Sequence, residues 1–157
     1  LPALEDVIDE SNIHGWLQNR ITMTESRLAA LITWQVGRKP ETLGTLHQVW
    51  ELAGERLAAA TGGAEDAPEA YRMVQDILLE GMPCDRVSQV TVTNGNEVVW
   101  ETTHCLHRQY FDAVGGDVSH YYALRESFLN GYLGTLKPGM RYTIEECPAG
   151  SGAAYIS

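Results

Sequence analysis

Apolar side chains recur every three or four residues in two long stretches near the start of the chain, a spacing typical of amphipathic helices. The first predicted helix covers about residues 16–36, and Gly37 and Pro40 end it. The second carries a single apolar stripe over residues 43–57 and ends at a Thr-Gly-Gly sequence. Both stretches therefore predict helices with one buried face.

A third helix has a clear start signal. Asp66 can cap it, Pro68 lies in its first turn, and Glu69 follows Asp66 by three residues, as in a capping box. Its apolar face continues to Leu78, and a Gly-x-Pro sequence follows. The first half of the chain thus predicts three successive helices.

Beyond the third predicted helix, apolar and polar residues alternate strictly along the chain. Two β-branched runs, at about 87–93 and 96–103, flank an Asn-Gly pair, which is the strongest short signal for a β-hairpin. A helix is predicted over about 105–113, and a longer one follows from Asp117 or Ser119. A strand beginning at about residue 140 and a short final strand close the chain.

Separate helical and antiparallel strand runs predict an α+β fold, with the helices packed on one face of a small antiparallel sheet. A length of 157 residues is typical of one domain. We therefore expect a single domain, with a helical N-terminal part (residues 1–66) and an α+β part (residues 67–157).

Charge narrows the choice of partners. The formal net charge is −10, from 21 acidic and 11 basic residues, which disfavours nucleic acid and anionic membrane surfaces. No apolar run approaches the roughly 20 residues of a membrane span, and the first ten residues are acidic where a signal peptide would be basic. A small molecule is the expected partner.

The three cysteines are Cys84, Cys105 and Cys147, an odd and sparse set that does not indicate a disulfide framework. Free thiols are typical of a reducing compartment, so we expect a cytoplasmic protein. Glu145, Glu146 and Cys147 could form one corner of a metal site, but such a site needs three or four ligands. No cofactor is expected, and zinc is not favoured.

The densest polar cluster is Thr-Thr-His-Cys-Leu-His-Arg at residues 102–108, between a predicted strand and a predicted helix. Cys105 there could be an activated nucleophile, with His104 and His107 close in sequence. His120 begins the next long helix and could face the same pocket. The simpler interpretation is a buried cysteine with surface or capping histidines.

Four further side chains could contact a ligand. Tyr121, Arg125 and Tyr132 lie on one face of the long predicted helix, where Arg125 could hold a carboxylate. Trp100 in the hairpin could close over a flat ligand. Core packing, with Arg125 extending toward solvent, is the alternative for this face.

Residues 117–155, beginning DVSHYYALRESFLNGYL, resemble the 4-vinyl reductase domain and the larger group that includes 2-aminothiazoline-4-carboxylate hydrolase-like proteins. The preceding segment, EAYRMVQDILLEGMPCDRVSQVTVTNGNEVVWETTHC, is similar to the hydrolase-like branch, and the resemblance covers about residues 69–157. That branch implies a cysteine at the end of the hairpin strand, which Cys105 matches.

The sequence departs from this resemblance at the positions that bind zinc in some members of the group. In phenol sensors with such a domain, cysteines and a glutamate bind zinc. Here Ser119, Ile144 and Tyr155 stand near the corresponding places, and only Cys147 matches. We therefore expect the sensor-type zinc site to be absent.

The sequence thus favours a hydrolase-like enzyme that acts on a cyclic C–N bond of a small, carboxylate-bearing substrate, or a related biosynthetic cyclase or isomerase. Cys105 would be the nucleophile or acid/base, and a histidine would move protons. The alternative is a non-catalytic domain that binds a small aromatic ligand, as a sensor does. A homodimer through the N-terminal helices is compatible with either function.

Overall fold

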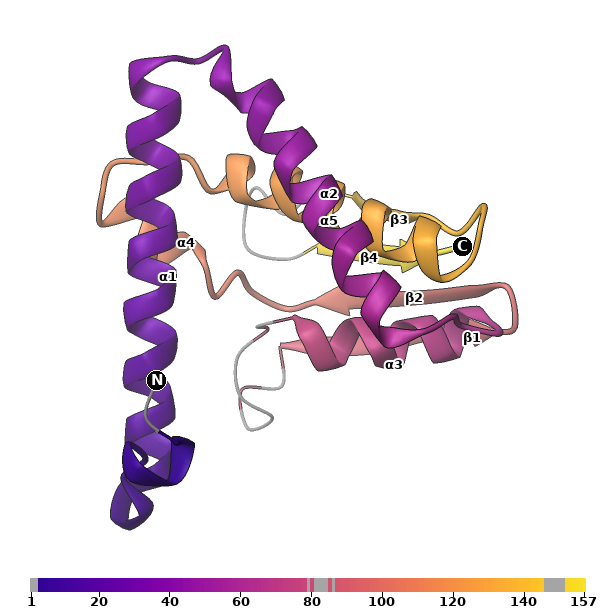
Figure 1. The fold of residues 1–157 in the computed structure, drawn as a ribbon, viewed down its shortest axis with the longest axis horizontal. Coiled ribbons are helices and arrows are strands. Elements are labelled where there is room, and N and C mark those ends of the chain that lie inside the picture. Colours follow the sequence, from indigo (N-terminus) through magenta and orange to yellow (C-terminus); the bar gives the residue numbers. More distant parts are fainter. Residues whose placement is uncertain (1–2, 79, 81–84, 86, 146–151) are drawn as a thin grey trace.

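A computed structural model of the chain describes residues 3–78, 80, 85, 87–145 and 152–157. The fold is α+β, with a four-stranded antiparallel sheet (Figure 1). The helices Ala67–Ile77 and Val118–Leu136 pack against this sheet, whereas in the described part of the chain the two long N-terminal helices contact other helices, so the expectation that they pack on the sheet is corrected. Two single 3-10 turns, Leu4–Asp6 and Glu10–Asn12, precede the first helix.

The three N-terminal helices form as predicted: α1 (Ile13–Arg38), α2 (Thr42–Thr61) and α3 (Ala67–Ile77). Asp66 caps α3, because its Oδ1 accepts the backbone N–H of Glu69 at 2.9 Å. The Glu69 carboxylate accepts from the backbone N–H of Glu65 at 2.7 Å, one residue before the cap. The predicted cap is therefore confirmed, but the Glu69 side chain bonds to the backbone N–H of Glu65 and not to that of Asp66, as it would in a standard capping box.

The Asn-Gly hairpin is also confirmed, by β1 (Ser88–Asn94) and β2 (Glu97–Thr102). The Asn94 side chain closes the turn by accepting the N–H groups of Asn96 and Glu97 at 2.9 and 3.0 Å. The two remaining strands are β3 (Tyr142–Glu145) and β4 (Gly152–Ile156). Because β4 inserts between β2 and β3, the strand order is β1-β2-β4-β3.

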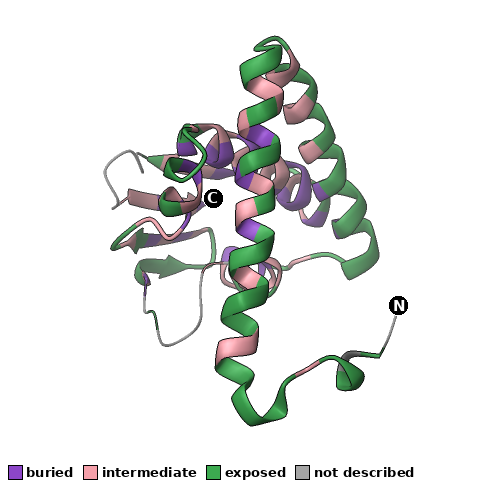
Figure 2. Cartoon of the chain, turned by 90° about the vertical axis from the view of Figure 1, so that its left-hand side faces the viewer, coloured by how far each residue is buried: buried purple, intermediate pink, exposed green. Residues whose placement is uncertain are grey.

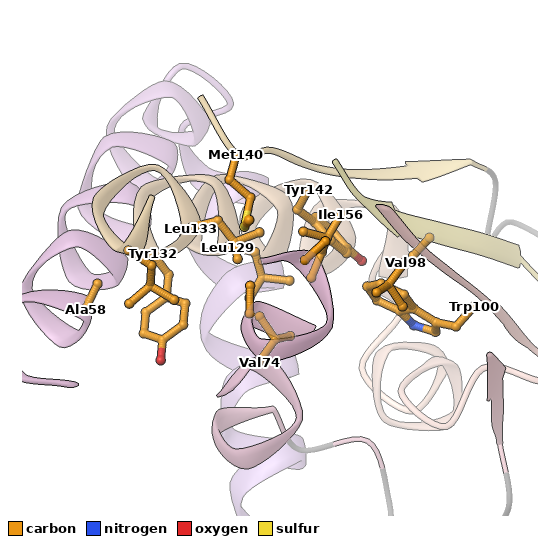
Figure 3. Close-up of a cluster of buried hydrophobic side chains, with 14 residues drawn as sticks. Ala58, Val74, Val98, Trp100, Leu129, Tyr132, Leu133, Met140, Tyr142 and Ile156 are labelled. Atoms are coloured by element: carbon orange, nitrogen blue, oxygen red, sulfur yellow. The ribbon is translucent and has the colours of Figure 1, made fainter. Parts of the chain in front are cut away.

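The main core lies between the buried face of the sheet and the helices (Figure 3). Cross-strand neighbours share this face: Val98 is opposite Ile156, and Trp100 is opposite Ala154. Helix α5 (Val118–Leu136) runs across them and contributes four buried side chains. These are Leu129, Tyr132, Leu133 and Leu136.

Two glycines allow α2 and α5 to cross at very short distance. A Cβ added to Gly54 would overlap the carbonyl oxygen of Phe128, and one added to Gly131 would overlap that of Glu51. Glycine is needed at both positions because each faces the backbone of the other helix, which cannot move aside as a side chain can. This crossing fixes α2 against the body of the protein.

The helix predicted over residues 105–113 is shorter than expected. Helix α4 spans Arg108–Asp112, and the residues between β2 and α4 form bends. The Cys105 sulfur accepts the Arg108 backbone N–H at 3.3 Å, so a side chain takes the place of the helical carbonyl acceptor. Cys105 is therefore outside the helix and three residues ahead of it.

The outer edge of β3 is paired with a side chain. Arg141 and Ser157 exchange backbone hydrogen bonds at 2.8 and 3.0 Å, so the polar backbone groups of the next residue, Tyr142, point away from β4. The Asn130 amide meets both of them: its Oδ1 accepts the Tyr142 N–H at 2.9 Å, and its Nδ2 donates to the Tyr142 carbonyl at 3.1 Å. Asn130 therefore substitutes for a neighbouring strand.

Replacing Asn130 by alanine is expected to lower the free energy of unfolding by about 2 kcal/mol, because two half-buried backbone groups lose their partners. Urea unfolding followed by circular dichroism measures this loss. Asn96→Ala, in the exposed hairpin turn, is the control and should change stability by less than about 0.5 kcal/mol. A similar small change in Asn130→Ala would contradict the structural role of this amide.

Helix α1 contacts the rest of the protein along one side only. Of its 26 residues, Glu25, Ala29 and Ile32 are buried. Most of its remaining surface is exposed (Figure 2). Ala29 and Ile32 join a second hydrophobic cluster with α4 and the start of α5, whose other members are Phe111, Val118, Tyr121, Tyr122 and Leu124.

Candidate functional site

Cys105 lies half-buried in the segment that leads from β2 to α4. Its sulfur accepts two hydrogen bonds, one from the Tyr122 hydroxyl at 3.0 Å and one from the Arg108 backbone N–H at 3.3 Å. Tyr122 comes from the first turns of α5, which brings this helix against the bend that holds Cys105. Two donors on one sulfur stabilise negative charge there, as a nucleophilic thiolate requires.

His107 is held by a glutamate of α1. Its Nδ1 lies 3.0 Å from Oε1 of Glu25, and both residues are buried, at 3% and 4% exposed. The imidazole also packs against two tyrosine rings, with centroids 4.4 Å from Tyr121 and 5.9 Å from Tyr122. His107 therefore links α1 to the tyrosine that contacts Cys105.

Burial raises the pKa of Tyr121 well above its ordinary value, and the opposing charge of Arg125 offsets this only in part. The Tyr121 phenol is neutral at physiological pH as a result. Its part in the site is to pack against the His107 ring, not to act as a base.

The structure does not place a histidine on the thiol. In the described part of the chain, the hydrogen-bonding groups on the Cys105 sulfur are the Tyr122 hydroxyl and the Arg108 N–H. His104 is exposed, with its Nδ1 3.1 Å from the Thr103 hydroxyl. The expected Cys–His contact is thus replaced by a Cys–Tyr contact, because the bend turns His104 outward and Glu25 holds His107.

His120 is half-buried in the first turn of α5, next to the cap of that helix. The cap is Asp117, whose pKa is lowered because the backbone N–H of Ser119 donates to it, with smaller effects from the nearby His120 and Arg108. This confirms Asp117 as the helix start. His120 lies close to this capping carboxylate and is not itself the cap.

Arg125 already has a carboxylate partner within the chain. Its guanidinium forms an ion pair with Glu80, and its centre lies 6.0 Å from the Tyr142 ring centroid. Burial by itself would lower the pKa of Arg125, but Tyr142 and Glu80 outweigh it and raise that pKa, so the charge is permanent. Arg125 is only 4% exposed. Its carboxylate partner in the structure is Glu80, whereas the sequence suggested a substrate carboxylate.

Trp100 and Tyr132 belong to the main core, each 1% exposed (Figure 3). Trp100 packs between Tyr71 and Tyr142, with ring centroids 5.0 and 5.9 Å away. The Tyr132 hydroxyl lies 3.4 Å from the Thr61 hydroxyl, between α5 and the end of α2. The structure thus gives both rings a packing environment and not a cavity wall.

A cavity of about 530 Å³ opens between α4, the start of α5 and β3. Tyr122 lines it, so the hydroxyl that contacts Cys105 belongs to a cavity wall. The rest of its lining combines one basic residue with acidic, small and apolar ones: Arg108, Asp112, Gly116, Asp117, Val118, Ser119, Ala123, Glu126 and Ile144. A smaller cavity of about 140 Å³ lies on the other side of α4, against His107, Glu25 and Tyr110.

Within the described ranges, no three His, Cys, Asp or Glu side chains gather closely enough to hold a metal ion. Glu145 ends β3, whereas Cys84, Glu146 and Cys147 lie outside the described residues. Over the same ranges, no helix combines the length and the apolar character that crossing a bilayer demands.

Two residues of this site were not predicted from the sequence. Glu25 stands in the apolar stripe of α1, four residues after Ile21 and three before Leu28, and an acidic residue in that position is a signal of a buried partner. Tyr122 had no such signal. Its neighbour Tyr121 carries the same chemistry, and only the orientation of α5 decides which ring meets the sulfur.

No protein-family model, no curated protein and no solved structure matches this chain.

Proposed function

We propose that this chain is a hydrolase-like enzyme that opens a C–N bond in a small cyclic substrate, with Cys105 as the nucleophile. The observation that carries the proposal is the 3.0 Å contact between the Cys105 sulfur and the Tyr122 hydroxyl, at the wall of a cavity of about 530 Å³. A cavity of this size accommodates a small ring compound.

In the proposed reaction the sulfur attacks the electrophilic ring carbon, and a C–S bond replaces the C–N bond. Cys105 reacts as the thiolate, and the electron pair of the broken bond stays on nitrogen. Tyr122, whose hydroxyl donates to the sulfur, gives its proton to that nitrogen. A water molecule then cleaves the thioester-type intermediate and returns a proton to Tyr122, which releases the acid and restores the Cys105 thiolate.

The charges of the cavity support a substrate with groups of both signs. Arg108 lines one part of the wall and suits a carboxylate, whereas Asp117 and Glu126 suit a protonated nitrogen. Arg125, which sequence reasoning assigned to the carboxylate, is paired with Glu80. We assign the carboxylate-binding role to Arg108 because its side chain lines the cavity.

Tyr122→Phe is expected to slow alkylation of Cys105 about tenfold at neutral pH, because the sulfur loses a hydrogen bond that stabilises its charged form. Iodoacetamide labelling followed by mass spectrometry measures the rate, in a Cys84→Ser/Cys147→Ser background where Cys105 is the remaining thiol. Tyr110→Phe, on α4 beside the smaller cavity, is the control and should react at the parent rate. Equal rates in both variants would exclude an activating role for Tyr122.

The reaction itself is tested by incubating the protein with cyclic C–N compounds that carry a carboxylate, such as thiazoline and lactam carboxylates. We expect ring-opened product, and a covalent adduct on Cys105 after rapid acid quenching, both lost in Cys105→Ala. Binding without turnover or adduct would overturn the proposal and favour the ligand-binding alternative.

A further inference from the structure

The smaller cavity, of about 140 Å³, lies between α1 and α4, and its lining shares no residue with the cavity beside Tyr122. Its α1 wall consists of Gln18, Ile21 and Glu25, which are three and four residues apart and therefore lie on one side of the helix. The rest of the described lining is Asp85, Leu106, His107, Gln109 and Tyr110. The side chains of the two helices thus leave a small space between them.

Within the described ranges, one oxygen of the Glu25 carboxylate has a partner and the other has none. Oε1 lies 3.0 Å from Nδ1 of His107, whereas Oε2 is buried and forms no hydrogen bond to a described residue. Taking a carboxylate oxygen out of water without giving it a donor is costly. Because Glu25 lines the cavity, a molecule inside the cavity can supply the missing donor.

The other side chains of the lining favour a donor with a positive charge and an apolar part. Asp85 adds a second carboxylate, and the described lining contains neither Lys nor Arg to attract an anion. The Gln109 Nε2 donates to the Leu106 carbonyl at 3.1 Å, which leaves the Gln109 Oε1 as an acceptor. Tyr110 and Ile21 supply apolar surface, which suits an alkyl chain better than a bare metal ion.

We propose that this cavity binds the primary ammonium group of a small alkylamine, which donates to Oε2 of Glu25. A primary ammonium carries one positive charge and three N–H donors, so it can pair with the carboxylate and also donate to an amide oxygen. A cavity of about 150 Å³ accommodates a molecule the size of benzene, and n-butylammonium is no larger. This inference is independent of the proposed function, because it involves neither Cys105 nor the larger cavity.

The test is an NMR titration of the 17.4 kDa protein with n-butylammonium chloride at constant ionic strength. We expect saturable shifts of the side-chain amide signals of Gln18 and Gln109, with a dissociation constant on the order of 1 mM. Potassium chloride carries the same charge without N–H donors and should leave these signals unchanged. The absence of saturable shifts overturns the proposal, as do equal shifts with potassium, which indicate attraction between charges alone.

Two glutamate variants test the contact with Oε2. Glu25→Gln keeps an oxygen for His107 but replaces the charged oxygen by a neutral amide, so it should raise the dissociation constant about tenfold or more. Glu55→Gln removes the same charge at an exposed position on α2 and should bind as the parent does. Circular dichroism checks that both variants are folded. Equal affinity of the folded Glu25→Gln variant and the parent contradicts the proposed contact.

A lysine derivative distinguishes two sources of the ammonium group. Nα-acetyl-lysine amide carries the butylammonium chain on a peptide backbone. If it shifts the Gln18 and Gln109 signals as n-butylammonium does, the cavity accepts a lysine side chain of a protein. If only n-butylammonium shifts them, the ligand is a free amine. Either result supports an ammonium site at Glu25, whereas shifts that persist in Glu25→Gln overturn it.

Discussion

Replacing Gly131 by alanine is expected to lower the free energy of unfolding by about 2 kcal/mol, although alanine is the better helix former. The added Cβ would overlap the Glu51 carbonyl oxygen and lie 2.9 Å from its carbonyl carbon. Because these atoms belong to the α2 backbone, the helices would have to separate, and the apolar contacts along α5 would loosen. Urea unfolding followed by circular dichroism measures the loss.

Gly44→Ala is the matched control on α2. No atom lies within 4 Å of a Cβ added there, so the substitution should only improve helix propensity and stabilise the protein by up to about 1 kcal/mol. The two glycine variants are thus expected to change stability in opposite directions. A Gly131→Ala variant as stable as Gly44→Ala would contradict the close contact between the α2 and α5 backbones.

Glu25→Ala is expected to lower the free energy of unfolding by about 3 kcal/mol, because it leaves the buried Nδ1 of His107 without its partner. The His107 ring also supports Tyr122 at 5.9 Å, so the contact between Tyr122 and Cys105 should loosen. Slower alkylation of Cys105 in the folded variant is the expected second effect. Glu25 would then be a positioning residue that acts through His107 and Tyr122.

Glu25→Gln is the conservative comparison, because its amide oxygen can still accept from His107 Nδ1. It should retain most of the stability and of the Cys105 alkylation rate. An equal loss in both Glu25 variants would mean that the carboxylate charge holds His107, and not the hydrogen bond alone. Glu55→Ala, at an exposed position on α2, controls for the loss of an acidic side chain.

Local patterns in the sequence predicted the elements well. Helical periodicity placed α1 and α2, the Asp66 cap placed the start of α3, and the Asn-Gly pair placed the hairpin. Each of these signals acts over a few residues. The main error was the start of α4, where the Cys105 side chain, and not a backbone carbonyl, accepts the Arg108 N–H.

The partners within the site could not be predicted in the same way, because they are far apart along the chain. His107 meets Glu25 from 82 residues away, and Cys105 meets Tyr122 from 17 residues away. Such pairs depend on how α1, α4 and α5 are oriented in three dimensions. The sequence could therefore suggest Cys105 as a candidate, with a histidine partner and a substrate-binding Arg125 as hypotheses, but it could not show that the sulfur contacts Tyr122 and that Arg125 pairs with Glu80.

The amide of Asn130 has a consequence for how the protein behaves at high concentration. An exposed strand edge offers free N–H and C=O groups, to which a strand of another molecule can add, and this is a route to fibrous aggregates. On β3 the groups of Tyr142 that would accept such a strand are already bonded to Asn130. At the opposite edge, the register of β1 shifts between Val90 and Val92, which interrupts a regular ladder. Both edges of the sheet thus resist polymerisation by strand addition.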